Sequence, residues 1–153
     1  MFAAWAGLHA KHARALWDRA GALAEVQVEG KKAWLLADDE NVLGAPPAAR
    51  GVRLVPGMDP YLSMRDRELL APDPALRKRL WRPLGNPGAV LVDGVLAGLW
   101  RPAKKGTRLI VNVELLNGAT EDALTAEAER LAPFRGAESG EIEFRSSASA
   151  SSG

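Results

Sequence analysis

Residues 56–67, PGMDPYLSMRDR, combine the end of a strand, a turn and the start of a helix. The preceding residues 52–55, VRLV, are β-prone, and Gly57 gives the chain the freedom that a turn requires. Asp59-Pro60 is typical of a helix start, because Asp accepts hydrogen bonds from exposed amides and Pro fits the first helical position. The triplet 65–67, RDR, is then predicted one turn into this helix, where the residues alone favour a solvated face.

On the C-terminal side of this stretch the pattern predicts a small β-rich domain. Residues 88–92 and 95–100 flank Asp93-Gly94, a pair that favours a two-residue type I′ turn. Residues 108–115 alternate apolar and polar side chains and predict a further strand. The basic segment 101–106 between them is expected to be an exposed loop.

A helix should follow this sheet and pack on it. Thr120 is a suitable N-cap, with acidic residues directly after it. The apolar stripe consists of Leu124, Ala128 and Leu131. Glu127 and Arg130 fall outside this stripe. Phe134 is free to cover the end of the helix, and residues 141–144 can add a last short strand.

The N-terminal part predicts two short helices, over residues 2–7 and 8–20, and then a β-hairpin over 23–36. The apolar face of the second helix is predicted to consist of Leu8, Ala15, Leu16 and Ala20. Lys11 and Arg14 lie on its other face, and Lys31 and Lys32 lie at the hairpin tip. Two helices and a hairpin are the layout of a helix-turn-helix with a wing, although short helices with a few basic residues more often simply face water.

The densest basic cluster of the chain follows a second Asp-Pro helix start at Asp73-Pro74. It contains Arg77, Lys78, Arg79 and Arg82, with Trp81 among them. Cations beside an aromatic ring can grip a phosphate backbone and stack a base. Exposed charges around a buried Trp are the commoner outcome.

Composition excludes several classes of function. The 153 residues carry a net charge of +1, so any nucleic-acid binding must rest on local patches. The absence of cysteine excludes disulfides and thiolate metal sites and fits a cytoplasmic protein. No apolar run is long enough to span a bilayer. His9 and His12 lack a third ligand nearby, and we expect no metal, no cofactor and no catalytic constellation.

Several of these motifs together resemble a known family. The strings LVPGMDPYLSMRDR, WRP at 81–83, VLVDGVLAGLWR and EAERLAPF are similar to the C-terminal half of the bacterial winged helix DNA-binding domain family. This family includes AlkZ-like and YcaQ-like DNA glycosylases, and the resemblance covers about residues 2–145. It implies a DNA-facing architecture with double-stranded DNA as the partner. Val95 departs from the pattern, because the family often has Arg after the Asp-Gly turn.

The resemblance also implies what this chain lacks. Glycosylase members carry a glutamine-rich catalytic motif in their N-terminal part, whereas Gln27 is the single Gln here. We therefore expect no base excision by the chain alone. The first helix of a winged helix has no counterpart, which leaves Phe2, Trp5 and Trp17 exposed or covered by another domain or copy. We therefore expect the chain to be a fragment or a shortened relative of a longer family member.

These observations predict an α+β protein, a truncated winged helix followed by a small β-rich domain, barrel-like or an open sheet, with one packed C-terminal helix. The expected limits are 1–44 for the incomplete winged helix, 45–50 for a linker within an irregular segment 38–50, 51–145 for the β-rich domain and 146–153 for a disordered tail. The DNA-binding candidates are Lys11, Arg14, Lys31, Lys32, Arg65, Arg67, Arg77 and Lys78. Two alternatives stay open. One is a non-catalytic dimerisation module or degenerate fragment, and the other is an enzyme completed by N-terminal family domains.

Overall fold

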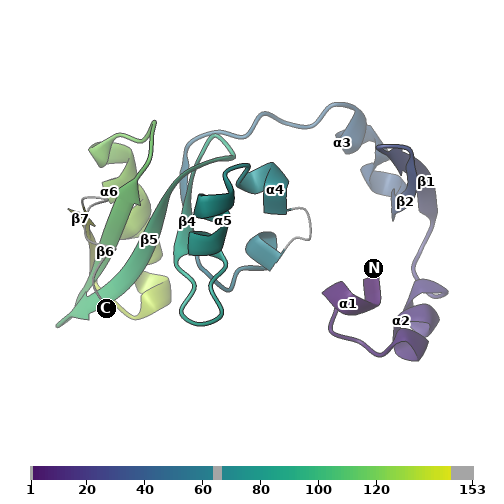
Figure 1. Ribbon diagram of the computed structural model, residues 1–153, viewed down its shortest axis with the longest axis horizontal. Coiled ribbons are helices and arrows are strands. Elements are labelled where there is room, and N and C mark those ends of the chain that lie inside the picture. The colour runs from purple at the N-terminus through teal and green to yellow at the C-terminus, as the bar shows by residue number, and fades with distance from the viewer. Residues whose placement is uncertain (1, 64–66, 146–153) are drawn as a thin grey trace. The chain divides into compact units, whose positions relative to one another are not determined.

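The protein is described by a computed structural model that covers residues 2–63 and 67–145 (Figure 1). The chain divides into two compact units, Met1–Ala48 and Ala49–Gly153. The predicted Arg65 and the predicted tail lie outside the described residues. The α+β class predicted from the sequence is confirmed, because helices and antiparallel strands alternate irregularly along the chain.

The N-terminal unit contains the two helices and the hairpin predicted for it. Its elements are α1 (Phe2–Trp5), α2 (Ala10–Trp17), β1 (Leu23–Val28), β2 (Lys31–Leu36), η1 (Ala37–Asp39) and α3 (Glu40–Gly44). The strands pair antiparallel from Leu23 with Leu36 to Val28 with Lys31. The turn at Glu29-Gly30 has positive φ at both residues, as a tight hairpin turn requires.

The helical turns η1 and α3 correct the sequence prediction, which treated residues 38–50 as an irregular segment. Three acidic residues, Asp38, Asp39 and Glu40, lie in the first turns of these helices, where the positive end of a helix favours them. Proline and alanine dominate only from residue 45 onward, and there the chain is irregular.

Aromatic side chains, rather than the predicted apolar stripe, hold α2 in the N-terminal unit. The Trp17 ring lies 5.6 Å from that of Phe2 and 5.9 Å from that of Trp34, measured between centroids. Ala13, one turn before Trp17, is the single buried residue among the described side chains of this unit. The predicted face of Leu8, Ala15, Leu16 and Ala20 was wrong, because the last three of these are exposed.

The C-terminal unit is built around a five-stranded sheet. Its elements are β3 (Val52–Val55), η2 (Pro60–Ser63), α4 (Arg67–Leu70), α5 (Pro74–Leu80), β4 (Gly88–Val92), β5 (Val95–Lys105), β6 (Arg108–Leu115), α6 (Glu121–Leu131), η3 (Pro133–Arg135) and β7 (Ser139–Phe144). The strand order is β3-β4-β5-β6-β7. Neighbours are antiparallel except β6 and β7, which are parallel because α6 connects them.

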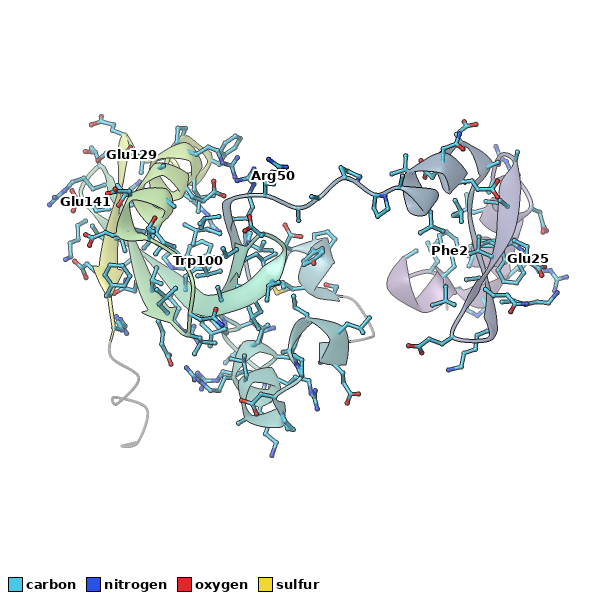
Figure 2. The ribbon with its side chains drawn as sticks, turned by 90° about the horizontal axis from the view of Figure 1, so that it is seen from above. Phe2, Glu25, Arg50, Trp100, Glu129 and Glu141 are labelled. Carbon is cyan, nitrogen blue, oxygen red and sulfur yellow. The ribbon has the colours of Figure 1, made fainter. Side chains whose placement is uncertain are left out.

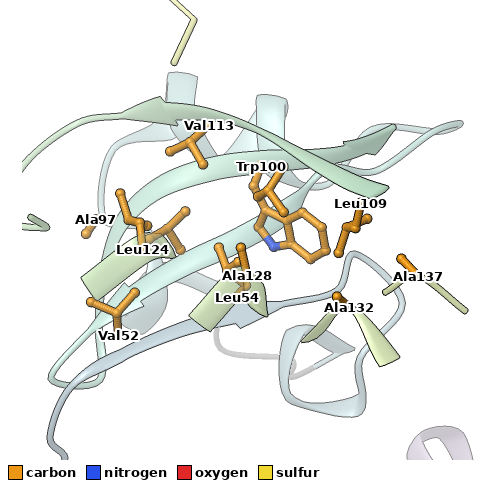
Figure 3. Packing of buried hydrophobic residues seen from close by; sticks show 12 residues of the cluster. Val52, Leu54, Ala97, Trp100, Leu109, Val113, Leu124, Ala128, Ala132 and Ala137 are labelled. Atoms are coloured by element: carbon orange, nitrogen blue, oxygen red, sulfur yellow. The ribbon is translucent and has the colours of Figure 1, made fainter. Parts of the chain in front are cut away.

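Both faces of this curved sheet are covered (Figure 1). Helix α6 packs on one face over a cluster that includes Leu54, Trp100, Val111 and Leu124 (Figure 3). A second cluster, with Leu62, Leu80 and Leu99, lies beneath η2, α4 and α5 on the other face. Figure 2 shows the side chains of this unit, with Trp100 inside it and Glu129 and Glu141 on its outside. The predicted packing of the C-terminal helix on the sheet is confirmed.

Local signals predicted the ends of elements well. The side chains of Asp73 and Thr120 accept hydrogen bonds from Ala75 N and Ala123 N, as N-caps do. The Asp93-Gly94 turn has φ of 49° and 81°, which fits the predicted type I′ turn. Asp59 accepts from Tyr61 N at 2.8 Å, but the following turn is the short 3₁₀ helix η2.

Three sequence expectations for this unit were wrong. The basic segment 101–106, expected as an exposed loop, continues β5 to Lys105 and pairs with β6 from Arg101–Asn112 to Lys105–Arg108. Phe134 covers nothing, because its side chain is 79% exposed. Glu127, expected outside the packed face of α6, is buried.

Candidate nucleic-acid interface

In the N-terminal unit the candidate cations lie on α2 and at the hairpin tip. Lys11 and Arg14 are exposed at i, i+3 spacing on α2, so their side chains are neighbours on the helix surface. His9 caps this helix by accepting from Lys11 N at 3.4 Å. Within the described residues neither Lys11 nor Arg14 makes an ion pair. Both charges are therefore available to an anionic partner.

The two lysines of the hairpin tip differ in their surroundings. Lys32 Nζ lies 2.9 Å from Glu25 Oε1, its neighbour across the hairpin. Lys31 is exposed and has no acidic partner in the part of the chain that the structure describes. Because an exposed ion pair must be broken before its lysine can bind a phosphate, Lys31 is the better placed of the two.

The C-terminal unit uses two of its candidate arginines within its own fold. Arg77 donates to the carbonyls of Ala71 and Pro72 at 2.8 and 2.9 Å and pairs with Glu68. The guanidinium of Arg67 lies 5.0 Å from the centroid of the Trp81 ring. These contacts order the ends of α4 and α5, and they leave Arg77 little freedom to meet a ligand.

The other residues of the basic cluster are also divided between side chains that are paired within the fold and side chains that are not. Arg79 forms an ion pair with Glu114 of β6. Trp81 is half-buried, and its Nε1 donates to Leu62 O at 2.7 Å. Lys78 and Arg82 are exposed, and among the described residues neither has an acidic partner. Of the four cations that the sequence grouped, two are therefore unpaired within the described residues.

The buried carboxylate of Glu127 is the charged group that the sequence did not reveal. It accepts from Leu54 N of β3 at 3.2 Å and from Arg130 at 2.7 and 2.8 Å. Burial raises the pKa of Glu127, but the hydrogen bonds from Arg130 and Leu54 and the charges of Arg130 and Arg53 lower it further, so that the pKa lies below its ordinary value. Glu127 joins α6 to the first strand of the sheet and has a structural role.

No group of three or more His, Cys, Asp or Glu residues is placed to hold a metal ion within residues 2–63 and 67–145. His9 and His12 lie with ring centroids 6.4 Å apart at the start of α2. In the same described ranges no helix has the length and apolar character that crossing a membrane requires.

A model of the DNA glycosylase AlkZ-like family matches residues 1–134, most of the chain. The protein belongs to this family. The resemblance read from the sequence motifs is therefore confirmed.

A sequence comparison and a structure comparison, both with DNA glycosylases from Streptomyces sahachiroi, support this membership. The chain is 37% identical over 87 residues to an interstrand DNA cross-link repair glycosylase, an alignment that covers 54% of this chain and 23% of that protein. The solved structure of the DNA glycosylase AlkZ superposes with a TM-score of 0.67 and 26% identity. That alignment covers 94% of this chain and 40% of the other. The chain spans less than half the length of these relatives.

Proposed function

We propose that this protein binds double-stranded DNA, mainly through phosphate contacts, as the DNA-binding part of a repair protein related to the AlkZ-like glycosylases. The observation that carries this proposal is a set of exposed cations on α2 and at the hairpin tip, Lys11, Arg14 and Lys31, which have no acidic partner within residues 2–63 and 67–145. Family membership supports DNA as the ligand. Phosphate contacts fit a set of separate lysines and arginines, because each one neutralises a phosphate and releases counterions.

The order of the elements in the N-terminal unit supports a winged-helix mode of binding. Two helices are followed at once by a hairpin, so α2 takes the place of the recognition helix and residues 29–32 take that of the wing tip. In this mode Lys11 and Arg14 approach the backbone or the major groove, and Lys31 contacts an adjacent phosphate. Lys32 contributes less, because Glu25 already neutralises it.

The C-terminal unit adds a second candidate surface at α5. Lys78 of α5 and Arg82, which follows the helix, are exposed, and neither has an acidic partner among the described residues. Arg67 stacks on Trp81, and Arg77 is bound to backbone carbonyls, so we assign these two a structural role. Base excision forms no part of the proposal, because Gln27 is the single glutamine of the chain and no counterpart of the family's glutamine-rich motif is present.

Fluorescence anisotropy of a labelled duplex at two salt concentrations tests this proposal. We expect log K to fall linearly with log salt, with a slope of about 0.9 for each phosphate contact. The triple variant K11A/R14A/K31A should lose most of the affinity and flatten the slope by roughly 2 to 3. A matched control removes Lys105, which is exposed but paired with Glu143 at 2.7 Å. No binding at low salt, or the same loss in K105A as in the triple variant, would overturn the proposal.

A second candidate function is self-association through the N-terminal unit. Trp34, Leu36 and Leu43 are each about half exposed, in a unit with one buried residue among its described side chains. Apolar side chains that are this exposed in a small unit are the ones that a second copy of the chain would cover. Sedimentation analysis should then detect a dimer that depends on concentration and that L36S/L43S abolishes. The control is L84S in the other unit, where Leu84 is 88% exposed. A monomer at all concentrations excludes this function.

A further inference from the structure

A small hollow lies at one end of the sheet in the C-terminal unit. It has a volume of about 240 Å³. Its lining comes from the end of β5, the start of β6 and the segment around η3, and consists of Pro102, Ala103, Lys104, Leu109, Arg135 and Ala137. Figure 3 shows Leu109 and Ala137 at the same end of the core as Trp100. The hollow therefore combines an apolar wall with two cationic side chains.

Both cations are held in place without being neutralised. The guanidinium of Arg135 lies 5.7 Å from the centroid of the Trp100 ring. Lys104 Nζ donates to Gly136 O at 2.9 Å. Within the described residues neither side chain has an ion-pair partner. The nearby cations differ, because Lys105 pairs with Glu143 at 2.7 Å and Arg108 pairs with Glu141 at 2.6 Å.

This arrangement suits a phosphate group. Arginine presents five N–H donors in a planar fork that matches phosphate oxygens, and in the described part of the chain none of those of Arg135 is used in a hydrogen bond. Lys104 has two further N–H groups beyond the one bound to Gly136. Contacts that already fix both side chains reduce the entropy that ligand binding would cost.

The surroundings of the two cations favour a nucleotide over a bare anion. Pro102, Leu109 and Ala137 offer an apolar wall to a sugar or a base. Phe134 precedes Arg135 in η3 but is not part of the lining of the hollow; its side chain is 79% exposed, and an exposed aromatic ring is a surface on which a base can stack. Exposed aromatic rings and cations are the side chains that proteins combine to bind unpaired nucleotides.

We propose that this hollow binds a nucleotide through its phosphate, with Arg135 and Lys104 as the phosphate ligands and Phe134 as the stacking surface. The ligand is either a free nucleoside monophosphate or an unpaired nucleotide of a DNA strand, since both present the same group. The site goes beyond the proposed duplex binding, because its residues belong to the C-terminal unit and differ from Lys11, Arg14 and Lys31. Each proposal can therefore fail without the other.

Titration of the ¹⁵N-labelled full chain, followed by NMR, tests this proposal. The probes are thymidine 5′-monophosphate, a short thymidine oligonucleotide, thymidine and inorganic phosphate. We expect saturable shifts of the Trp100 indole N–H and of the amides of residues 104 and 135–137 with the first two probes. Thymidine should cause none, and inorganic phosphate should bind more weakly at the same residues. The tighter of the first two probes identifies the source of the nucleotide.

Variants then separate a binding role from a structural one. R135A and K104A should each weaken nucleotide binding about tenfold or more, because each removes a charged hydrogen-bond donor. R135K keeps the charge without the planar fork and should also weaken binding. R108A is the matched control, because Arg108 is exposed but paired, and it should leave the affinity unchanged. Equal affinity in R135A and wild type, no saturable shift with either nucleotide probe, or inorganic phosphate binding as tightly as the nucleotide would overturn the proposal.

Discussion

The two units of this protein differ in how they bury their apolar residues. The C-terminal unit has a buried cluster on each face of its sheet, and Trp100 in one of these clusters is 1% exposed. The N-terminal unit has one buried residue, Ala13, among its described side chains, and it relies on contacts between half-exposed aromatic rings. The C-terminal unit therefore has a hydrophobic core that stabilises it on its own. The N-terminal unit would gain more stability from a partner that covers its apolar side chains.

The largest expected effect comes from removing the buried tryptophan of the C-terminal unit, Trp100. W100A should cost about 3 to 5 kcal/mol of unfolding free energy, because it leaves a cavity and removes the hydrogen bond that Trp100 Nε1 donates to Val55 O at 3.0 Å. The matched change W34A in the N-terminal unit should cost about 1 kcal/mol, because Trp34 is 47% exposed. Urea unfolding followed by NMR amide signals of each unit measures both. Equal losses would remove the contrast between the units.

The next effect concerns a close approach of two backbones. A Cβ added at Gly140 of β7 would lie 2.3 Å from the Ala128 carbonyl in α6, so G140A must push strand and helix apart. We expect a loss of about 1 to 3 kcal/mol. The control is G21A in the N-terminal unit, where an added Cβ meets no atom within 4 Å, and it should change stability by less than about 0.5 kcal/mol. Thermal unfolding followed by circular dichroism compares the two, and an unaffected G140A would show that α6 and β7 separate readily.

A smaller effect should appear as a dependence on pH. The pKa of Glu127 is lower in the folded than in the unfolded chain, so its ionised form stabilises the fold above the ordinary pKa of about 4.3. This contribution is lost as the pH falls through that value toward the folded pKa. At pH 7, E127Q should cost about 1 kcal/mol. The difference between E127Q and wild type should shrink between pH 5 and pH 3, to be measured by urea unfolding across this range. A constant difference would contradict the assignment.

The smallest expected effect separates the two lysines of the hairpin tip. K31A should weaken duplex binding and flatten the salt dependence by about one phosphate contact. K32A should have a smaller effect, because Glu25 neutralises Lys32 across the hairpin. Anisotropy titrations of both variants at the same two salt concentrations provide the comparison. A larger effect for K32A would place the phosphate contact on the paired lysine and contradict the proposed wing.

The sequence predicted those features that depend on residues close together in the chain. Turn and cap chemistry within a few residues predicts both hairpins and the caps at Asp73 and Thr120. The same chemistry predicts the helical turn that begins at Asp59 in the stretch 56–67. The extension of β5 to Lys105 was missed because the apolar run ends at Trp100 and residues 101–105, RPAKK, are basic and contain a proline; pairing with β6 determines this part of the strand. The burial of Glu127 was missed because its partner, Leu54 N–H, lies 73 residues earlier.

For the candidate site as well, the sequence predicted local features but not contacts between distant residues. Basic residues could be grouped by sequence, but their partners could not, since Glu114 and Glu25 lie on strands that only the folded sheets bring beside Arg79 and Lys32. Lys104 and Arg135 were not recognised as a pair, because the ends of β5 and η3 are distant in sequence. Lys104-Lys105 before the turn at Gly106 was the one available signal.

The hydrogen bond from Leu54 to Glu127 also affects how the C-terminal unit folds during translation, because the unit is incomplete until both residues have been synthesised. Strand β3 is the first part of the C-terminal unit to be synthesised, yet the carboxylate that accepts from its backbone follows 73 residues later. At typical rates of translation this interval lasts roughly 4 to 15 s. During that time β3 and its neighbours expose apolar side chains that α6 will later cover. The nascent chain is therefore most exposed to aggregation and to chaperones just before α6 is made.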